Sequence, residues 1–129
     1  MRSGSLLVAL VFTSFLALGT LASAQSATTS LRGTVTDAKG AVVVGAAVHL
    51  KDPATGLSRD SMTGGQGEYQ FLELPPATYE LTVKAQGFAT LRETGIQLLV
   101  RTPGTANVTL QVATGVETVE VQALSLIHI

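Results

Sequence analysis

The chain of 129 residues contains no cysteine and no tryptophan, and aromatic residues make up only 5 % of it. The absence of cysteine excludes disulfides, thiolate catalysis, cysteine-based zinc sites and a lipidated cysteine anchor. Charged residues are also scarce, at 13 %, while 46 % of the residues are hydrophobic, which excludes a disordered polyelectrolyte. Lys and Arg total 8 against 9 Asp and Glu, so no basic excess predicts nucleic acid as a partner. The composition therefore favours a small β-rich module and suggests no enzyme.

The first segment of the chain has the pattern of a secretory signal peptide. Within residues 1–24, the positive residue Arg2 precedes an apolar run from Leu6 to Leu18. This run is shorter than the roughly 20 residues that span a bilayer as a helix, so an uncleaved membrane anchor is the weaker alternative. The pattern predicts an exported protein, and the residues that define the expected cleavage site are Ala22, Ala24 and Gln25.

After a short polar leader at residues 25–30, apolar and polar residues alternate in short runs separated by turn residues. An alternation with a period of two residues indicates half-buried β-strands, and turn signals about every 8–12 residues are typical of a β-sandwich. The sequence therefore predicts an all-β domain whose strands lie at residues 31–36, 46–51, 57–63, 68–71, 79–85, 106–112 and 116–121, with weaker strands at 90–93 and 96–100.

Two connections in this pattern carry specific expectations. The glycine-rich run 64–67 (GGQG) predicts a tight hairpin between the strands at 57–63 and 68–71. The prolines of residues 74–78 (LPPAT) predict a rigid corner. The hydroxyl of Tyr79 can bond back over this corner, as in the tyrosine corners of other sandwiches.

Side chains with catalytic or metal-binding chemistry are few and scattered. His49 lies on the polar face of its expected strand beside Lys51, and one histidine cannot form the two- or three-histidine sites of catalytic zinc. The sequence contains no Gly-x-Ser-x-Gly motif, and no phosphate-binding pattern follows the glycines of residues 64–67. We therefore expect no catalytic residues and no cofactor. The isolated carboxylates are expected to serve turns and solubility, with a loop-end calcium site left open, and they are Asp37, Asp52, Asp60, Glu68 and Glu73.

Three aromatic side chains allow two interpretations. Tyr69 and Phe71 share one face of a strand, and Tyr79 begins a later strand. Filling of the core is the first interpretation, because aromatic side chains bury a large apolar area. The alternative is a platform on which these three rings contact a carbohydrate.

A series of short motifs follows one another in the order and spacing of a known family. The motifs are GTVTD at 33–37, GAAVHL at 45–50, TG at 55–56, GEYQF at 67–71, LPP at 74–76, YELTV at 79–83 and GF at 87–88. Together they resemble the carboxypeptidase regulatory-like domain. The resemblance implies a transthyretin-like, seven-stranded Greek-key β-sandwich over residues 31–122, without catalysis of its own. The residues that match the family pattern are Gly33, Gly40, Gly45, Gly56, Gly67, Pro75, Pro76, Tyr79, Gly87 and Phe88.

The setting of this domain resembles the amino-terminal extension of Oar-like, TonB-dependent outer-membrane receptors. It follows a signal-peptide pattern, and the segment GVETVEV at 115–121 comes after it. The resemblance implies protein interaction or spacing in the periplasm or at the periplasmic face of the outer membrane, with other receptor domains or periplasmic proteins as partners. A carbohydrate-binding module with polysaccharide as its partner is the alternative. Residues 123–129 (ALSLIHI) do not continue the family pattern and are expected to be a truncated or non-native end.

Overall fold

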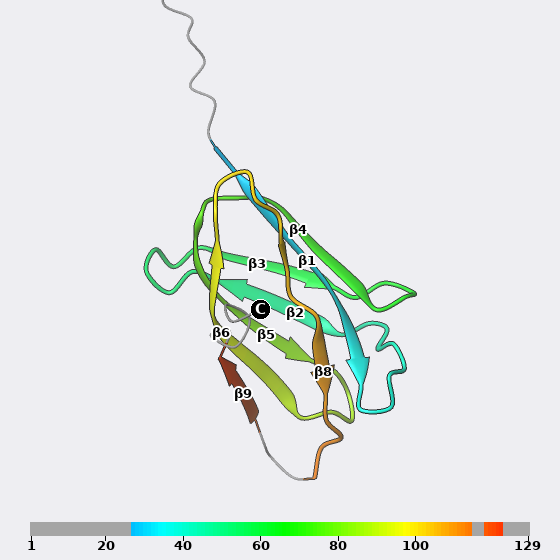
Figure 1. Cartoon of the computed structure of the whole chain (residues 1–129). Helices are drawn as coiled ribbons and strands as arrows, with labels where there is room; N and C mark the ends of the chain where they lie inside the picture. The colour runs from blue at the N-terminus through cyan, green and yellow to red at the C-terminus, as the bar shows by residue number, and fades with distance from the viewer. Residues whose placement is uncertain (1–26, 115–117, 123–129) are drawn as a thin grey trace, which may run out of the picture.

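The computed structural model describes residues 27–114 and 118–122, and within these ranges all regular structure is β-strand. No helix in the described part of the chain has the length and apolarity to cross a membrane. Figure 1 shows the strands arranged in two layers, which confirms the expected all-β sandwich. The strands are β1 (Thr29–Asp37), β2 (Ala47–Lys51), β3 (Ser58–Met62), β4 (Glu68–Leu74), β5 (Ala77–Lys84), β6 (Thr90–Leu98), β7 (Gly104–Thr105), β8 (Val108–Leu110) and β9 (Thr118–Gln122).

The two sheets differ in size and are both mixed. The smaller sheet has the order β4-β1-β7, and β8 continues along β1 beyond β7. The larger sheet has the order β3-β2-β5-β6-β9, with β9 at one edge (Figure 1). Strands β7 and β8 pair with β1 in parallel, and β9 pairs with β6 in parallel, whereas the other pairs are antiparallel.

The core lies between the sheets and follows the alternation in the sequence. On β5, the side chains of Tyr79, Leu81 and Val83 point inward and are fully buried. Each such side chain contributes about 1.5–3 kcal/mol by leaving water. The alternation shifts by one residue at the left-handed Glu73 of β4 and at Gly95 of β6. The remaining core residues on the strands come from both sheets: Leu31, Val35, Val48, Leu50, Tyr69, Phe71, Leu74, Leu91, Ile96, Leu98, Val108 and Leu110.

The expected hairpin around residues 64–67 is wrong. β3 pairs with β2, and β4 pairs with β1, so the glycine-rich turn carries the chain from one sheet to the other. In this turn Gly67 has a φ of 72°, and its carbonyl accepts a 2.8 Å hydrogen bond from the Val35 N–H of β1. A tight turn permits a hairpin but does not require one, because strand pairing depends on which backbone edges meet.

The expected strands at 90–93 and 96–100 form one strand, β6. Gly95 has a φ of 74°, and the register between β5 and β6 shifts beside it, which is the geometry of a β-bulge. β1 also begins at Thr29, so its first two residues come from the expected leader, and the Thr29 hydroxyl donates to the Thr102 carbonyl at 2.8 Å. The described residues form nine strands and not seven, because β7 and β8 are separate pieces beside β1 and β9 adds a further edge.

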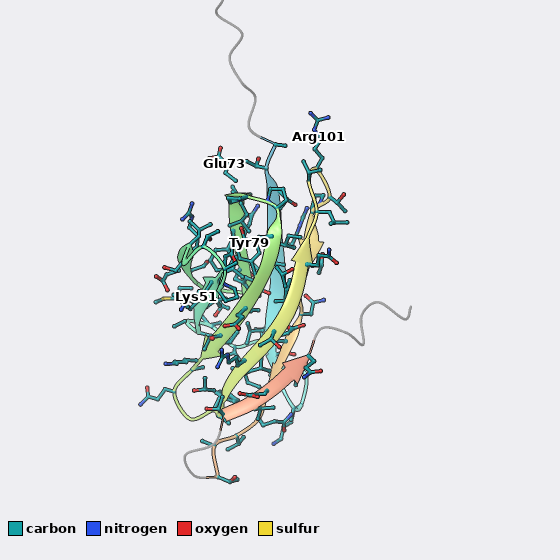
Figure 2. All side chains as sticks on the ribbon, turned by 90° about the vertical axis from the view of Figure 1, so that its left-hand side faces the viewer. Lys51, Glu73, Tyr79 and Arg101 are labelled. Carbon is teal, nitrogen blue, oxygen red and sulfur yellow. The ribbon has the colours of Figure 1, made fainter. Side chains whose placement is uncertain are left out.

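The corner before β5 is closed by a tyrosine. The Tyr79 hydroxyl donates to the Pro75 carbonyl at 2.5 Å, which confirms the expected tyrosine corner. Burial raises the pKa of Tyr79 above its ordinary value of 10.0, and the charge of Asp52 adds to this effect. The left-handed residue of the corner is Glu73, with a φ of 52°, and Figure 2 shows it at the same end of the sandwich as Arg101.

We expect Tyr79→Phe to lower the free energy of unfolding by about 1 kcal/mol, because it removes one hydrogen bond and keeps the buried ring. Urea denaturation followed by far-ultraviolet circular dichroism measures the change. An unchanged midpoint would show that the hydroxyl does not brace the corner.

Candidate functional site

The three aromatic side chains that could contact a carbohydrate are in the core. Tyr69 is 2 % exposed, Phe71 is 4 % and Tyr79 is 1 %. The rings of Tyr69 and Phe71 meet edge to face, with centroids 6.0 Å apart. Filling of the core is therefore confirmed, and a sugar platform made of these three rings is wrong because none of them offers a face to solvent.

Tyr69 also braces the smaller sheet from within. Its hydroxyl donates to the Ala106 carbonyl in the segment between β7 and β8, and burial raises its pKa above the ordinary value. Gly33 lies beneath this hydrogen bond, where a Cβ atom would overlap the Ala106 carbonyl oxygen. This family-pattern glycine therefore allows β1 to approach the neighbouring segment closely.

The other family-pattern residues also have structural roles. Pro75 and Pro76 form the corner before β5. Phe88 packs against the core and bridges to Val112. The family-pattern glycines with a left-handed backbone, at φ values from 72° to 84°, are Gly40, Gly45, Gly56, Gly67 and Gly87.

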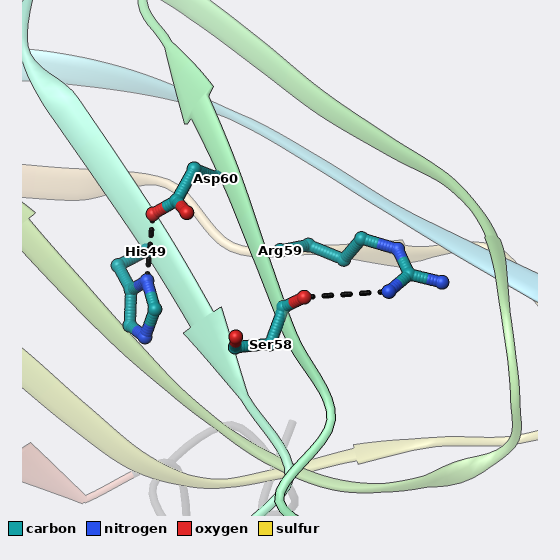
Figure 3. Close-up of polar contacts among 4 residues, drawn as sticks. All are labelled: His49, Ser58, Arg59 and Asp60. Atoms are coloured by element: carbon teal, nitrogen blue, oxygen red, sulfur yellow. Dashed lines mark hydrogen bonds and ion pairs between the residues drawn. The ribbon is translucent and has the colours of Figure 1, made fainter.

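His49 has a partner that the sequence pattern did not reveal. Its Nδ1 atom lies 2.7 Å from Oδ1 of Asp60, and Figure 3 shows the two side chains facing one another across β2 and β3, with Arg59 directed away. Antiparallel pairing across the turn at residues 52–57 places positions 49 and 60 opposite each other. A hairpin between β2 and β3 would therefore have predicted this contact. Both side chains are solvent-exposed, and such pairs contribute about 0–1 kcal/mol.

Three of the predicted turn carboxylates hold turns, and one of them is Glu68, whose Oε2 atom accepts a 3.0 Å hydrogen bond from the Gln66 N–H. Asp37 Oδ1 accepts hydrogen bonds of 2.9 Å from the N–H groups of Lys39 and Ala41. Asp52 accepts from the Ala54 N–H and the Thr55 hydroxyl, both at 2.9 Å. Within residues 27–114 and 118–122, no three side chains of His, Cys, Asp or Glu gather as a metal site would require.

Glu93 is a charged residue that is buried between the two sheets. It lies on β6 with its side chain directed between the sheets, and it is 5 % exposed. No hydrogen bond or ion pair joins its carboxylate to any other described residue. It lines a cleft of about 350 Å³ on the open side of the sandwich, together with Leu91, Thr105, Asn107, Val108, Thr109 and Val121. Continuing the alternation from Leu91 would have placed Glu93 inward from sequence alone.

Burial raises the pKa of Glu93 above its ordinary value of 4.5. The titratable group that interacts with it across the sandwich is the Tyr69 hydroxyl of β4, whose pKa Glu93 raises further. The folded state therefore binds the Glu93 proton more tightly than the unfolded state does. As a consequence, the free energy of unfolding falls as the pH rises from 4.5 through the raised pKa.

We expect Glu93→Gln to be more stable than the parent by about 1 kcal/mol at pH 7, because glutamine carries no charge to desolvate. The difference should shrink toward pH 4. Thermal unfolding across this pH range measures it, and Glu120→Gln on β9, which removes an exposed carboxylate, is the matched control. A variant that is less stable than the parent at pH 7 and more stable at pH 4 would contradict the prediction.

Two expectations fall outside the described residues. The cleavage-site residues Ala22, Ala24 and Gln25 precede residue 27, and the atypical tail at 123–129 follows residue 122. Both therefore stay predictions from the sequence.

Several solved structures are similar to the chain in fold. Wild-type catechol 1,2-dioxygenase of Acinetobacter radioresistens is 16 % identical with a TM-score of 0.55, and the match covers 77 % of this chain and 58 % of that one. The Bacillus anthracis TIE protein is 14 % identical with a TM-score of 0.56, covering 67 % and 17 %. A streptococcal ancillary pilin is 18 % identical with a TM-score of 0.53, covering 68 % and 33 %. At these identities the likeness shows the fold alone, and the chain spans little more than half of the dioxygenase.

Sequence comparison identifies the family. No curated protein matches the chain. A model described as the carboxypeptidase regulatory-like domain matches residues 30–111, which is well over half of the sequence. The match covers the motifs from Gly33 to Phe88 and the strands from β2 to β8. The chain therefore belongs to the carboxypeptidase regulatory-like domain family.

Proposed function

We propose that the chain is the exported, non-enzymatic amino-terminal module of a TonB-dependent receptor-like outer-membrane protein, where it serves protein interaction or spacing. The observation that carries this proposal is the order of two features along the chain. A signal-peptide pattern occupies residues 1–24, and the family match begins at residue 30 directly after it. An exported domain at the amino terminus is the arrangement expected of such a receptor extension.

The structural use of the polar side chains supports a scaffold role. Asp37 and Asp52 hold turns, and the hydroxyls of Tyr69 and Tyr79 brace backbone carbonyls. The histidine and its aspartate partner lie on an exposed sheet face, and no third side chain of residues 27–114 and 118–122 is bonded to them. These groups stabilise the fold and do not converge on one reaction centre.

The sheet edges supply contact surfaces for a partner. β3 and β9 are the two edges of the larger sheet. β3 carries the charges of Arg59 and Asp60, and charged residues on an edge disfavour pairing with another chain. β9 (TVEVQ) has three β-branched residues and a single charge, so its edge is better suited to accept a partner strand.

The genomic sequence downstream of codon 129 tests the receptor setting. We expect one reading frame that continues from the sandwich into a plug domain and a transmembrane β-barrel. An intact locus with an in-frame stop directly after this codon would reject the receptor proposal.

Export is tested separately by expressing the chain in a Gram-negative host and sequencing the amino terminus of the periplasmic product. Cleavage before Gln25 is expected. A product that stays in the cytoplasm and still begins at Met1 would reject export.

A further inference from the structure

The open side of the sandwich combines a strand edge and a carboxylate that both lack a partner among the described residues. β9 ends the larger sheet, and in the described chain it pairs only with β6. The cleft of about 350 Å³ lies between this edge and the β7–β8 segment of the other sheet. Glu93 lines the cleft, directly opposite Val121 in the register of β6 and β9.

We propose that this cleft receives the arginine or lysine side chain of a partner protein, carried on an extended segment that adds to the β9 edge, with Glu93 as its counter-charge. The proposal deepens the interaction role given above by naming the partner's chemistry. It rests on the proposed function in one respect, which is that the domain binds a partner protein.

The state of Glu93 points to a missing cation. Its side chain is more than nine-tenths buried and bonds to no described residue. Every fully enclosed side-chain oxygen of the described chain has a hydrogen-bond partner. Because the Glu93 oxygens have none there, they are not fully enclosed and retain some contact with the space of the cleft. A charge in such a site is costly alone and is stabilised by an opposite charge with good hydrogen-bond geometry.

The lining of the cleft fits a long basic side chain. Leu91, Val108 and Val121 offer apolar contact for an aliphatic stem. Thr105 and Thr109 also line the cleft, and their hydroxyls can accept from the N–H groups of the charged end. Asn107 lines the cleft too, but its Oδ1 atom already accepts hydrogen bonds from the N–H and hydroxyl of Thr34. A hard metal ion requires several oxygen ligands, and the cleft lining contains one carboxylate.

The geometry of the sheet brings such a side chain within reach. Strands in a sheet lie about 4.8 Å apart, so a strand added to β9 is about 10 Å from β6. A residue of that strand beside Val121 shares its inward parity with Glu93. Arg and Lys are the side chains long enough to pass Val121 and reach the carboxylate. A second copy of β9 cannot supply the cation, because the strand TVEVQ contains no basic residue.

Peptide titration of the full chain tests the proposal. The probe is the capped peptide Val-Thr-Arg-Thr-Val, whose arginine and valines share one face of an extended strand. Its matched control carries citrulline, which has the shape of arginine without the charge. Nuclear magnetic resonance of the isotope-labelled protein follows the amides of β9 and the carboxyl carbon of Glu93, and millimolar calcium chloride is a separate arm.

We expect the arginine peptide to shift the β9 amides and to bind at least about 10-fold more tightly than the citrulline peptide. The Glu93 carboxyl signal should then titrate at lower pH. Glu93→Gln should abolish the difference between the two peptides, whereas Glu120→Gln, an exposed carboxylate on β9, should keep it.

Equal affinities for the two peptides, or no binding of either, would overturn the proposal. This comparison uses the unmodified protein, so it does not depend on the folding of any variant. A response of the Glu93 signal to calcium but not to the arginine peptide would overturn it in favour of a metal site. Concentration-dependent self-association that shifts the β9 amides would show that a second copy occupies the edge. None of these results bears on the receptor setting, which the genomic sequence decides independently.

Discussion

Replacing Gly33 by alanine is expected to lower the free energy of unfolding by about 4 kcal/mol, because β1 leaves no room for a side chain at this position. The added Cβ atom would overlap the Ala106 carbonyl oxygen and lie 2.7 Å from the Tyr69 hydroxyl oxygen. The same carbonyl accepts the Tyr69 hydrogen bond, and the Ala106 N–H donates to the Arg32 carbonyl at 2.9 Å. A backbone held on both sides cannot move away without breaking these bonds, so β1 loses part of its attachment to β7 and β8.

Gly65→Ala is the matched control for this substitution. No atom lies within 4 Å of a Cβ built at Gly65, and its φ is not left-handed. We expect a change of about 0.5 kcal/mol or less there, as for most surface positions. Urea denaturation of both variants measures the two effects. A similar loss of unfolding free energy in both variants would show that replacing any glycine destabilises the domain, and that the close approach at Gly33 is not the cause.

Thr63→Val is expected to lower the free energy of unfolding by about 3 kcal/mol, although the two side chains have nearly the same shape. The buried Thr63 hydroxyl donates to the Val43 carbonyl at 2.7 Å and accepts from the Ala46 N–H at 2.8 Å. Valine would leave two buried backbone groups without partners, and each such group costs about 1–3 kcal/mol. This bridge fixes the segment before β2 against the chain that crosses between the sheets.

Thr63→Ser separates the hydroxyl from the methyl group. Serine keeps both hydrogen bonds and loses one buried methyl, so we expect a loss of about 1 kcal/mol. Chemical denaturation of the two variants in parallel gives the ranking. If serine destabilised the domain as much as valine, packing of the methyl group and not the hydroxyl bridge would be the cause.

The wrong hairpin at residues 64–67 shows what a local pattern leaves open. The glycines correctly mark a tight turn, in which the Gly67 N–H donates to the Gly64 carbonyl at 2.9 Å. Yet β3 turns away to pair with β2, because the turn at residues 52–57 already brings those two strands together. The same pairing creates the contact between His49 and Asp60, which sequence reasoning could not assign to strands that it had paired differently.

Glu93 shows a second limit. Its parity on β6 is readable from the sequence, but its environment is not. The cleft forms where β9 lies beside β6 and the β7–β8 segment lies beside β1, and both of these contacts are parallel pairings between distant parts of the chain. Parallel pairs need long connections, so no short turn motif announces them.

The sequence by itself determined the β-strands, their inward faces, the turns capped by Asp37 and Asp52, and the tyrosine corner. These features are local, since a period of two residues and a carboxylate two residues from an N–H group act within one segment. Only the tertiary structure decided which strands are neighbours, which aromatic rings are enclosed and where a buried carboxylate has no partner among the described residues. Alternating side chains suit any neighbouring strand of the right length, so the choice among neighbours is made by the packing of the whole core.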